Sequence, residues 1–344
     1  MRWILSYLRE ITHQSSQLTN SMEILQGRHA ATEATALIDL TLGAARKLSF
    51  AWLDAHAARL ELVLRPLLPE CAVVGLLSRR SAEAIAGLLA IWRVGAIYLP
   101  LDPECPSVRL RFLLEDARPA ALLVQVGVAV DASLPPIGVV RLETAAFECA
   151  AHAEGVRGGL SLIHPDASDC AYILYTSGST GSPKGVLGSR EALRRRCNWM
   201  WEAYPFAVDG CELCAQKTAA TFVDSLWETV GPLGAGVPLL LLPQELMAQP
   251  SRLAHVIDEW RVTRLVLVPA ALGMLLDASE EIGSGDRSRE GATEDASSPS
   301  PGQGGRLESL RLVSVSGDAF PLRLAARALR RMPRAKVSLL PSRP

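Results

Sequence analysis

The chain has 344 residues, of which 49% are hydrophobic and 21% are charged, and its 35 basic and 36 acidic residues give a formal net charge of −1. A balanced charge provides no overall attraction to nucleic acid or to an anionic membrane surface, so neither is expected as a partner. No run approaches the roughly 20 apolar residues of a membrane span, and the composition is typical of a globular protein with a sizeable core.

The first 35 residues carry little sign of regular structure. Residues 1–35 have weak periodicity and many polar side chains, so we expect a weakly structured N-terminal segment. No clear cleavage site follows the first residues, which argues against a secretory signal. We expect a cytoplasmic protein, with an amphipathic targeting segment in residues 1–17 as the alternative.

Helix-like and strand-like segments alternate over the next part of the chain. We expect helices at residues 48–68, 81–92 and 108–117, and short apolar strands at residues 71–77, 96–100 and 120–126. Ser81 is placed to cap the second helix. Continuous apolar strands separated by helices are typical of parallel sheets covered on both faces, so the pattern predicts an α/β fold.

The alternation resumes in the second half, with one interruption. We expect strands at 170–175, 238–242, 265–268, 310–315 and 337–340, and helices at 189–204, 226–233, 253–260 and 322–331. Residues 279–305 are rich in Glu, Asp, Ser, Gly and Pro, and this composition predicts a disordered surface insertion. A tolerated loop expansion is favoured over a regulatory or partner-binding segment.

The cysteines do not form a disulfide or metal framework. Seven cysteines are scattered over the chain, and only Cys211 and Cys214 form a Cys-x-x-Cys pair. A structural zinc site needs a second pair or nearby histidines, and the next histidine is His255. Two ordinary thiols are therefore favoured over a metal or redox site.

The strongest motif lies at residues 172–185, which read YILYTSGSTGSPKG. It follows an apolar strand and precedes a predicted helix. Glycines let backbone N–H groups approach an anion, hydroxyls donate hydrogen bonds, and Lys184 supplies a positive charge for a polyphosphate. The spacing differs from the Walker A and from the Gly-x-Gly-x-x-Gly patterns. A plain flexible turn gives no reason for Thr176, Ser177, Thr180 and Lys184 to follow a buried strand directly.

Residues 175–185 resemble the AMP-binding signature of adenylate-forming enzymes, which include acyl-CoA synthetases, luciferases and the adenylation domains of non-ribosomal peptide synthetases. Residues 93–103, 221–228 and 314–320 resemble, in the same order, segments of the peptide-synthetase branch. The resemblance runs from about residue 48 to about residue 340. It implies a partial AMP-binding domain over residues 36–344, with the layered parallel-sheet N-terminal lobe of that fold and no small C-terminal domain.

This resemblance implies ATP-dependent activation of a carboxylic acid as its acyl-AMP, for transfer to a thiol on CoA or on a phosphopantetheinyl carrier protein. Thr176 and Lys184 match the catalytic positions of the phosphate loop. The positions that the resemblance assigns to ATP are Thr176, Ser177, Gly178, Ser179, Thr180, Gly181, Lys184, Gly185, Gly317 and Asp318.

The acid pocket is assigned by the same resemblance to Phe222, Val223, Asp224, Ser314 and Ser316. Amino-acid-activating members carry an Asp directly after the aromatic residue, where it pairs with the substrate's α-ammonium. Here that position is Val223, and a valine cannot compensate a buried ammonium. We expect a keto, hydroxy, aryl or fatty acid, or an amino acid bound through Asp224 in a shifted register. Asp224 as a solvated or helix-capping acid is an equal alternative.

Later segments of the family have no counterpart in these 344 residues. They include the Asn-x-Tyr-Gly-x-Thr-Glu segment, whose Glu holds Mg²⁺, the ribose-binding Asp and the catalytic Lys of the small domain. We expect ATP and Mg²⁺ as cofactors, the latter with no protein ligand in this chain, and an impaired activity for the chain alone. The alternative is a catalytically inactive remnant that binds a nucleotide or a partner.

Overall fold

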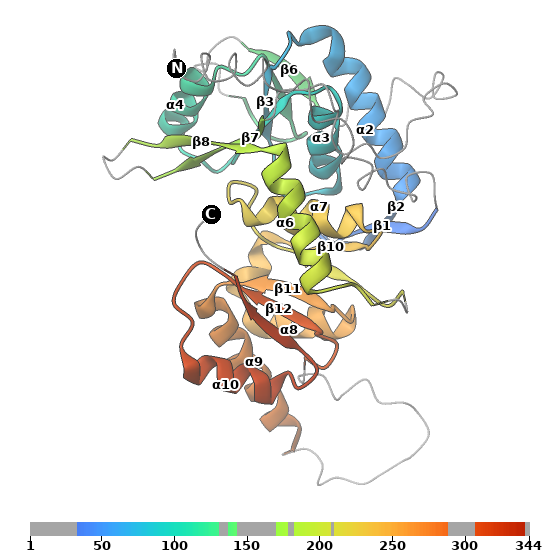
Figure 1. Ribbon diagram of the computed structural model, residues 1–344, viewed down its shortest axis with the longest axis vertical. Coiled ribbons are helices and arrows are strands. Elements are labelled where there is room, and N and C mark those ends of the chain that lie inside the picture. The colour runs from blue at the N-terminus through green and yellow to red at the C-terminus, as the bar shows by residue number, and fades with distance from the viewer. Residues whose placement is uncertain are drawn as a thin grey trace.

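The computed structural model describes residues 33–130, 137–142, 170–177, 182–207, 210–287 and 307–340. Two β-sheets and three groups of helices form its layers (Figure 1). The predicted α/β fold with parallel sheets is confirmed. No helix in these residues is long and apolar enough to cross a membrane.

The first sheet has six strands and carries the phosphate motif at one edge. Every neighbouring pair is parallel except the last, where β8 runs antiparallel to β7. Its strands are, in spatial order, β6 (Gly138–Arg141), β5 (Ala121–Val124), β3 (Val73–Leu77), β4 (Ile97–Leu101), β7 (Cys170–Thr176) and β8 (Lys184–Ser189).

The second sheet has seven strands and is parallel except for its edge strand β2, which is antiparallel to β1. Its strands are, in spatial order, β13 (Lys336–Leu339), β12 (Leu312–Val315), β11 (Arg264–Leu267), β9 (Cys214–Gln216), β10 (Leu239–Leu241), β1 (Thr35–Asp39) and β2 (Arg46–Ser49).

Helices fill the space between the sheets and cover their outer faces. The inner layer contributes to one apolar cluster with both sheets and consists of α2 (Phe50–Leu64), α3 (Ala82–Arg93), α6 (Arg190–Ala203) and α7 (Asp224–Gly234). Helix α4 (Ser107–Ala117) packs on the outer face of the six-stranded sheet. The outer face of the seven-stranded sheet is covered by α8 (Pro250–Glu259), α9 (Pro269–Arg287) and α10 (Leu322–Arg331). Two short 3-10 helices are η3 (Arg65–Leu67) and η4 (Gln244–Ala248).

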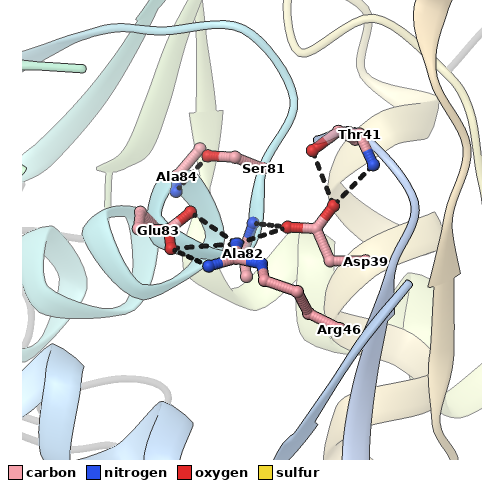
Figure 2. Close-up of polar contacts among 7 residues, drawn as sticks. All are labelled: Asp39, Thr41, Arg46, Ser81, Ala82, Glu83 and Ala84. Atoms are coloured by element: carbon pink, nitrogen blue, oxygen red, sulfur yellow. Dashed lines mark hydrogen bonds and ion pairs between the residues drawn. The ribbon is translucent and has the colours of Figure 1, made fainter. Parts of the chain in front are cut away.

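A buried carboxylate joins the edge of the seven-stranded sheet to the inner helix layer. Asp39, at the end of β1, has no exposed surface and accepts hydrogen bonds from both the backbone N–H and the hydroxyl of Thr41, at 2.8 and 2.6 Å (Figure 2). Its other oxygen accepts from Arg46 at 2.8 Å and from the Ala82 N–H at 3.1 Å. Arg46 also pairs with Glu83 at 3.0 Å. The start of α3 is thereby fastened to β1 and β2.

The predicted insertion begins too early. Helix α9 continues to Arg287, so the first nine residues of the expected insertion at 279–305 belong to a helix, and residues 288–306 lie outside the described part of the chain. Ser279 is fully buried and accepts a hydrogen bond from Arg331 of α10 at 2.8 Å. Arg327 pairs with Glu280 at 2.8 Å. The first residues of the segment expected to be disordered therefore contact the basic helix α10.

Candidate functional site

The phosphate motif forms a β-hairpin. Thr176 at the end of β7 and Lys184 at the start of β8 are register partners, and the Thr176 hydroxyl donates to the Lys184 carbonyl at 3.5 Å. Both residues are exposed, as are Ser177 and Gly185. Gly178, Ser179, Thr180 and Gly181 lie outside the described residues. The structure therefore brings Thr176, Ser177, Lys184 and Gly185 together around the base of the loop.

The helix predicted at 189–204 is present as α6, and a strand lies between the phosphate motif and this helix. Strand β8 leads from Lys184 to α6, which begins at Arg190, and β8 runs antiparallel to β7 (Figure 1). A helix N-terminus offers free backbone N–H groups to an anion. At the loop base, the exposed polar side chains include those of Thr176, Ser177 and Lys184.

Asp224 occupies the first turn of α7 and is held on two sides. The Trp227 indole N–H donates to Asp224 Oδ1 at 2.9 Å, and the Ser316 hydroxyl donates to Asp224 Oδ2 at 2.8 Å. Trp227 lies one helical turn further along α7, whereas Ser316 directly follows β12. Two residues predicted for the acid pocket, Asp224 and Ser316, are thus in direct contact although 92 positions separate them.

A largely apolar pocket of about 450 Å³, its open mouth included, lies beside this contact. Its walls come from α6 and α7 on one side and from β9, β11 and β12 on the other. Ser314, the third predicted acid-pocket residue found here, lines it and is 2% exposed. The apolar wall is formed mainly by Met200, Trp201, Phe206, Trp227, Pro232, Leu265, Val266 and Leu312.

The positively charged side chain of Arg196 interacts electrostatically with Asp224. The guanidinium carbon of Arg196 lies 4.9 Å from the ring centroid of Trp227 and 4.9 Å from that of Trp199. Burial lowers the pKa of Arg196, and the charge of Asp224 opposes that effect. Arg196 thus partly balances the Asp224 charge and lies over the ring of Trp227, whose indole N–H donates to Asp224.

Glu228 is a second carboxylate at the pocket wall, and it is almost completely buried. Its Oε2 accepts hydrogen bonds from the backbone N–H groups of Thr218 at 2.8 Å and Lys217 at 3.3 Å. Its Oε1 has no hydrogen-bond partner within the described residues. Burial raises the pKa of Glu228, while the charges of Lys217 and Arg80 act in the opposite direction. Glu228 therefore holds the segment that leads from β9 into the acid pocket.

The remaining predicted residues lie around the site without lining the pocket. Phe222 is 66% exposed and Val223 is 48% exposed. Gly317 follows Ser316 with φ of 101°, in the left-handed region that favours glycine, and a methyl group there would lie 3.3 Å from Val268. Asp318 is exposed. The roles assigned to these four residues stay predictions.

A match to a protein-family profile establishes the relationship of this chain to known proteins. The sequence profile described as "AMP-binding enzyme" matches residues 26–340. The chain belongs to this family.

Relatives within the AMP-binding family include large peptide synthetases. The chain is 35% identical over 212 residues to the beta-alanyl-bioamine nonribosomal peptide synthetase ebony of Drosophila melanogaster, covering 59% of this chain and 23% of that protein. It is 33% identical over 224 residues to the vanchrobactin synthetase VabF of Vibrio anguillarum, covering 65% of this chain and 8% of that protein. The chain therefore spans a quarter or less of these two relatives.

The predicted lobe of the adenylate-forming fold is confirmed by solved structures. The AMPPNP-bound form of the nonribosomal peptide synthetase FmoA3 superposes with a TM-score of 0.73 at 25% identity, covering 97% of this chain and 33% of that one. The crystal structure of IdnL1 superposes with a TM-score of 0.70 at 22% identity, covering 94% of this chain and 60% of that one.

The residues that the sequence did not single out as parts of the site are Arg196, Trp227 and Glu228. Trp227 and Glu228 stand inside the matched segment 221–228, and Trp227 lies three positions after Asp224, the spacing of neighbours on one helix face. That spacing alone could have indicated the Trp227–Asp224 contact. Arg196 carries no such signal, because its position beside Trp227 results from the packing of α6 on α7.

The sequence resemblance implies a bound Mg²⁺, and the absence of a protein ligand for it stays a prediction. Magnesium takes oxygen ligands in octahedral geometry, from one or two carboxylates together with phosphate and water oxygens. In the described part of the chain no group of three or more His, Cys, Asp or Glu residues is placed to hold a metal ion.

Proposed function

We propose that this chain binds ATP and a short amino acid whose amino group is displaced from the α-carbon, and that it takes part in activating that acid as an acyl-AMP. Membership of the AMP-binding family and the AMPPNP bound to a structural neighbour support the use of ATP. The name of the relative ebony refers to a β-alanyl group, whose amino nitrogen is on the β-carbon.

The observation that carries the proposal is the environment of Asp224. Its carboxylate is oriented by Trp227 and Ser316 beside the pocket, whereas Val223, at the position of the usual ammonium partner, is half exposed and apolar. Shifting the carboxylate by one residue moves the ammonium site relative to the bound acid. A carboxylate held by two donors keeps a fixed direction and can still accept from an ammonium group. These contacts favour an amino acid bound through Asp224, in a register shifted by one residue, over the alternative that Asp224 is a solvated or helix-capping residue.

The chemistry needs positioning and charge neutralisation from the protein. An oxygen of the acid's carboxylate forms a bond to the α-phosphorus of ATP, and the bond from that phosphorus to the bridging oxygen breaks, so pyrophosphate leaves with the electron pair. No covalent bond to the protein is formed. Thr176, Ser177 and Lys184 would bind the oxygens of the β- and γ-phosphates, where negative charge accumulates as pyrophosphate departs.

The acceptor of the activated acid is proposed to be a thiol, on CoA or on a phosphopantetheinyl carrier protein. The relationship to peptide synthetases favours the carrier protein. A cytoplasmic location stays part of the same proposal.

Equilibrium binding of acids tests the function. In the presence of AMPPNP we expect β-alanine to bind the chain more tightly than α-alanine or propionate, measured by calorimetric titration. The variant Asp224→Asn is expected to weaken β-alanine binding about tenfold or more, because an interaction with a charged group contributes about 1.5–3 kcal/mol. Asp277→Asn, which changes an exposed carboxylate on α9, is the matched control and should leave binding unchanged.

Two results would count against the proposal. Equal binding of β-alanine and propionate would show that Asp224 holds no ammonium group. If the chain binds AMPPNP but none of the tested acids, the alternative of a nucleotide-binding remnant is favoured.

A further inference from the structure

A tyrosine–aspartate contact fastens the hairpin that carries the phosphate motif. The Tyr175 hydroxyl, one residue before the end of β7, donates a hydrogen bond of 2.6 Å to Asp116 Oδ2 in the last turn of α4. Their separation of 59 residues means that only the tertiary fold brings them together. Burial and the neighbouring carboxylate raise the pKa of Tyr175, so the phenol keeps its proton and remains a donor.

The ring of Tyr175 also lies on the opposite strand. Tyr175 and Gly185 are register partners, and a methyl group added at Gly185 would lie 3.3 Å from the Tyr175 ring. The same ring packs against the apolar cluster that α4 forms with the outer face of the six-stranded sheet. One side chain thus contacts β8 next to Lys184 and ties that point to α4.

The need for such a tie follows from the position of β8. Within the described residues this strand is at the edge of the sheet and pairs with β7 alone, and it begins with three exposed residues. Strand β7 is paired with β4 at Tyr172, so the end of the hairpin near Thr176 lies beyond that pairing and relies more on side-chain contacts. Thr176 and Lys184, which the proposed function assigns to ATP, are the neighbours of Tyr175 and Gly185 at the end of this hairpin.

We infer that Tyr175 and Asp116 are positioning residues that hold the base of the phosphate loop, and that they set the affinity for the triphosphate without touching it. This inference rests on the proposed function. Because the loop is assigned to the β- and γ-phosphates, loss of the contact should weaken binding of ATP and leave binding of AMP unchanged. A purely structural role would affect the two nucleotides equally or neither of them.

The test compares ATP and AMP dissociation constants for the 344-residue chain and its variants. Tyr175→Phe and Asp116→Ala are each expected to weaken ATP binding about tenfold with AMP binding unchanged. The double variant should be no weaker than either single one, since both remove one contact. Asp116→Asn keeps an oxygen that accepts from the phenol and should restore wild-type binding. Tyr172→Phe is the matched control, because its ring lies over Gly188 near the far end of the hairpin.

Amide hydrogen exchange supplies a readout that does not depend on nucleotide. Exchange across β8 should be faster in Tyr175→Phe than in the wild type and in Tyr172→Phe. Unchanged exchange, or an ATP-to-AMP affinity ratio equal to that of the wild type, would overturn the inference while the proposed function stands. Failure of the wild-type chain to bind ATP would overturn the proposed function and this inference together, whereas equal affinities of the wild type for ATP and AMP would overturn this inference alone.

Discussion

Removing the charge of Asp39 should destabilise the fold strongly, although the residue lies outside the candidate site. Both carboxylate oxygens accept two hydrogen bonds each, from Thr41 on one side and from Arg46 and Ala82 on the other. An asparagine at this position has one acceptor oxygen, so its amide group would face donors on one side. At least two hydrogen bonds are lost, and buried donors are left unsatisfied.

The size of this effect can be bounded from the contacts. Breaking a buried ion pair costs about 3–5 kcal/mol, but Arg46 is one-third exposed and keeps Glu83 as a partner, so the lower end applies. We expect Asp39→Asn to lower the free energy of unfolding by about 3 kcal/mol, measured by urea unfolding with tryptophan fluorescence. Glu83→Gln, which removes the outer partner of Arg46, should lower it by about 1 kcal/mol or less.

The same variant has a defined pH dependence. Burial alone would raise the pKa of Asp39, but hydrogen bonds from Thr41, Arg46 and Ala82 outweigh burial and leave it below its usual value of 3.8. A lowered pKa in the folded state gives stability that is present above the unfolded pKa and is lost as the pH falls through the folded one. The difference in the free energy of unfolding between the wild type and Asp39→Asn should therefore have its full size at pH 7 and decrease only below about pH 4. A difference under about 1 kcal/mol at pH 7 would refute this reasoning.

Two further predictions concern buried titratable groups. Burial raises the pKa of Glu228, so the wild type should lose stability as the pH rises from the usual value of 4.5 through the folded value, whereas Glu228→Gln should not. The melting temperature of the wild type relative to this variant should thus be higher at pH 5 than at pH 8, and a constant difference would contradict the assignment. Burial also raises the pKa of Cys197 to about 12 and raises the pKa of Cys214. Iodoacetamide at pH 8 should therefore label the exposed Cys211 well before either buried cysteine. Equal labelling rates of the three cysteines, measured by mass spectrometry, would argue against this packing.

Burial on both faces makes the central strands of the six-stranded sheet predictable, although the buried strand β1 is not expected from the sequence and the partly exposed edge strand β13 is. Val73–Leu77 and Ile97–Leu101 read as continuous apolar runs because inner helices cover one face and α4 the other. Strands β2, β6 and β8 lie at sheet edges with exposed residues, so neither a continuous run nor a clear alternation marks them. Strand β9 has only three residues, too few to show a period.

In the candidate site, features that are contiguous in the sequence could be predicted, whereas contacts that only the tertiary fold creates could not. The phosphate motif can be recognised because its glycines, hydroxyls and lysine are contiguous in the sequence, but its hairpin form cannot, because the exposed strand β8 lacks a strand pattern. The sequence leaves the role of Asp224 open, since its partner Ser316 lies 92 positions away and no local pattern indicates their contact. Asp116 cannot be singled out either, because nothing in the α4 sequence marks a residue that faces β7.

The most direct test of the central proposal is a crystal structure of this chain with AMPPNP and β-alanine bound. We expect the β- and γ-phosphates at the hairpin loop beside Thr176 and Lys184, and the amino group of β-alanine within hydrogen-bonding distance of Asp224. Phosphates bound away from the hairpin, or an amino group directed away from Asp224 with the pocket occupied, would contradict the proposal.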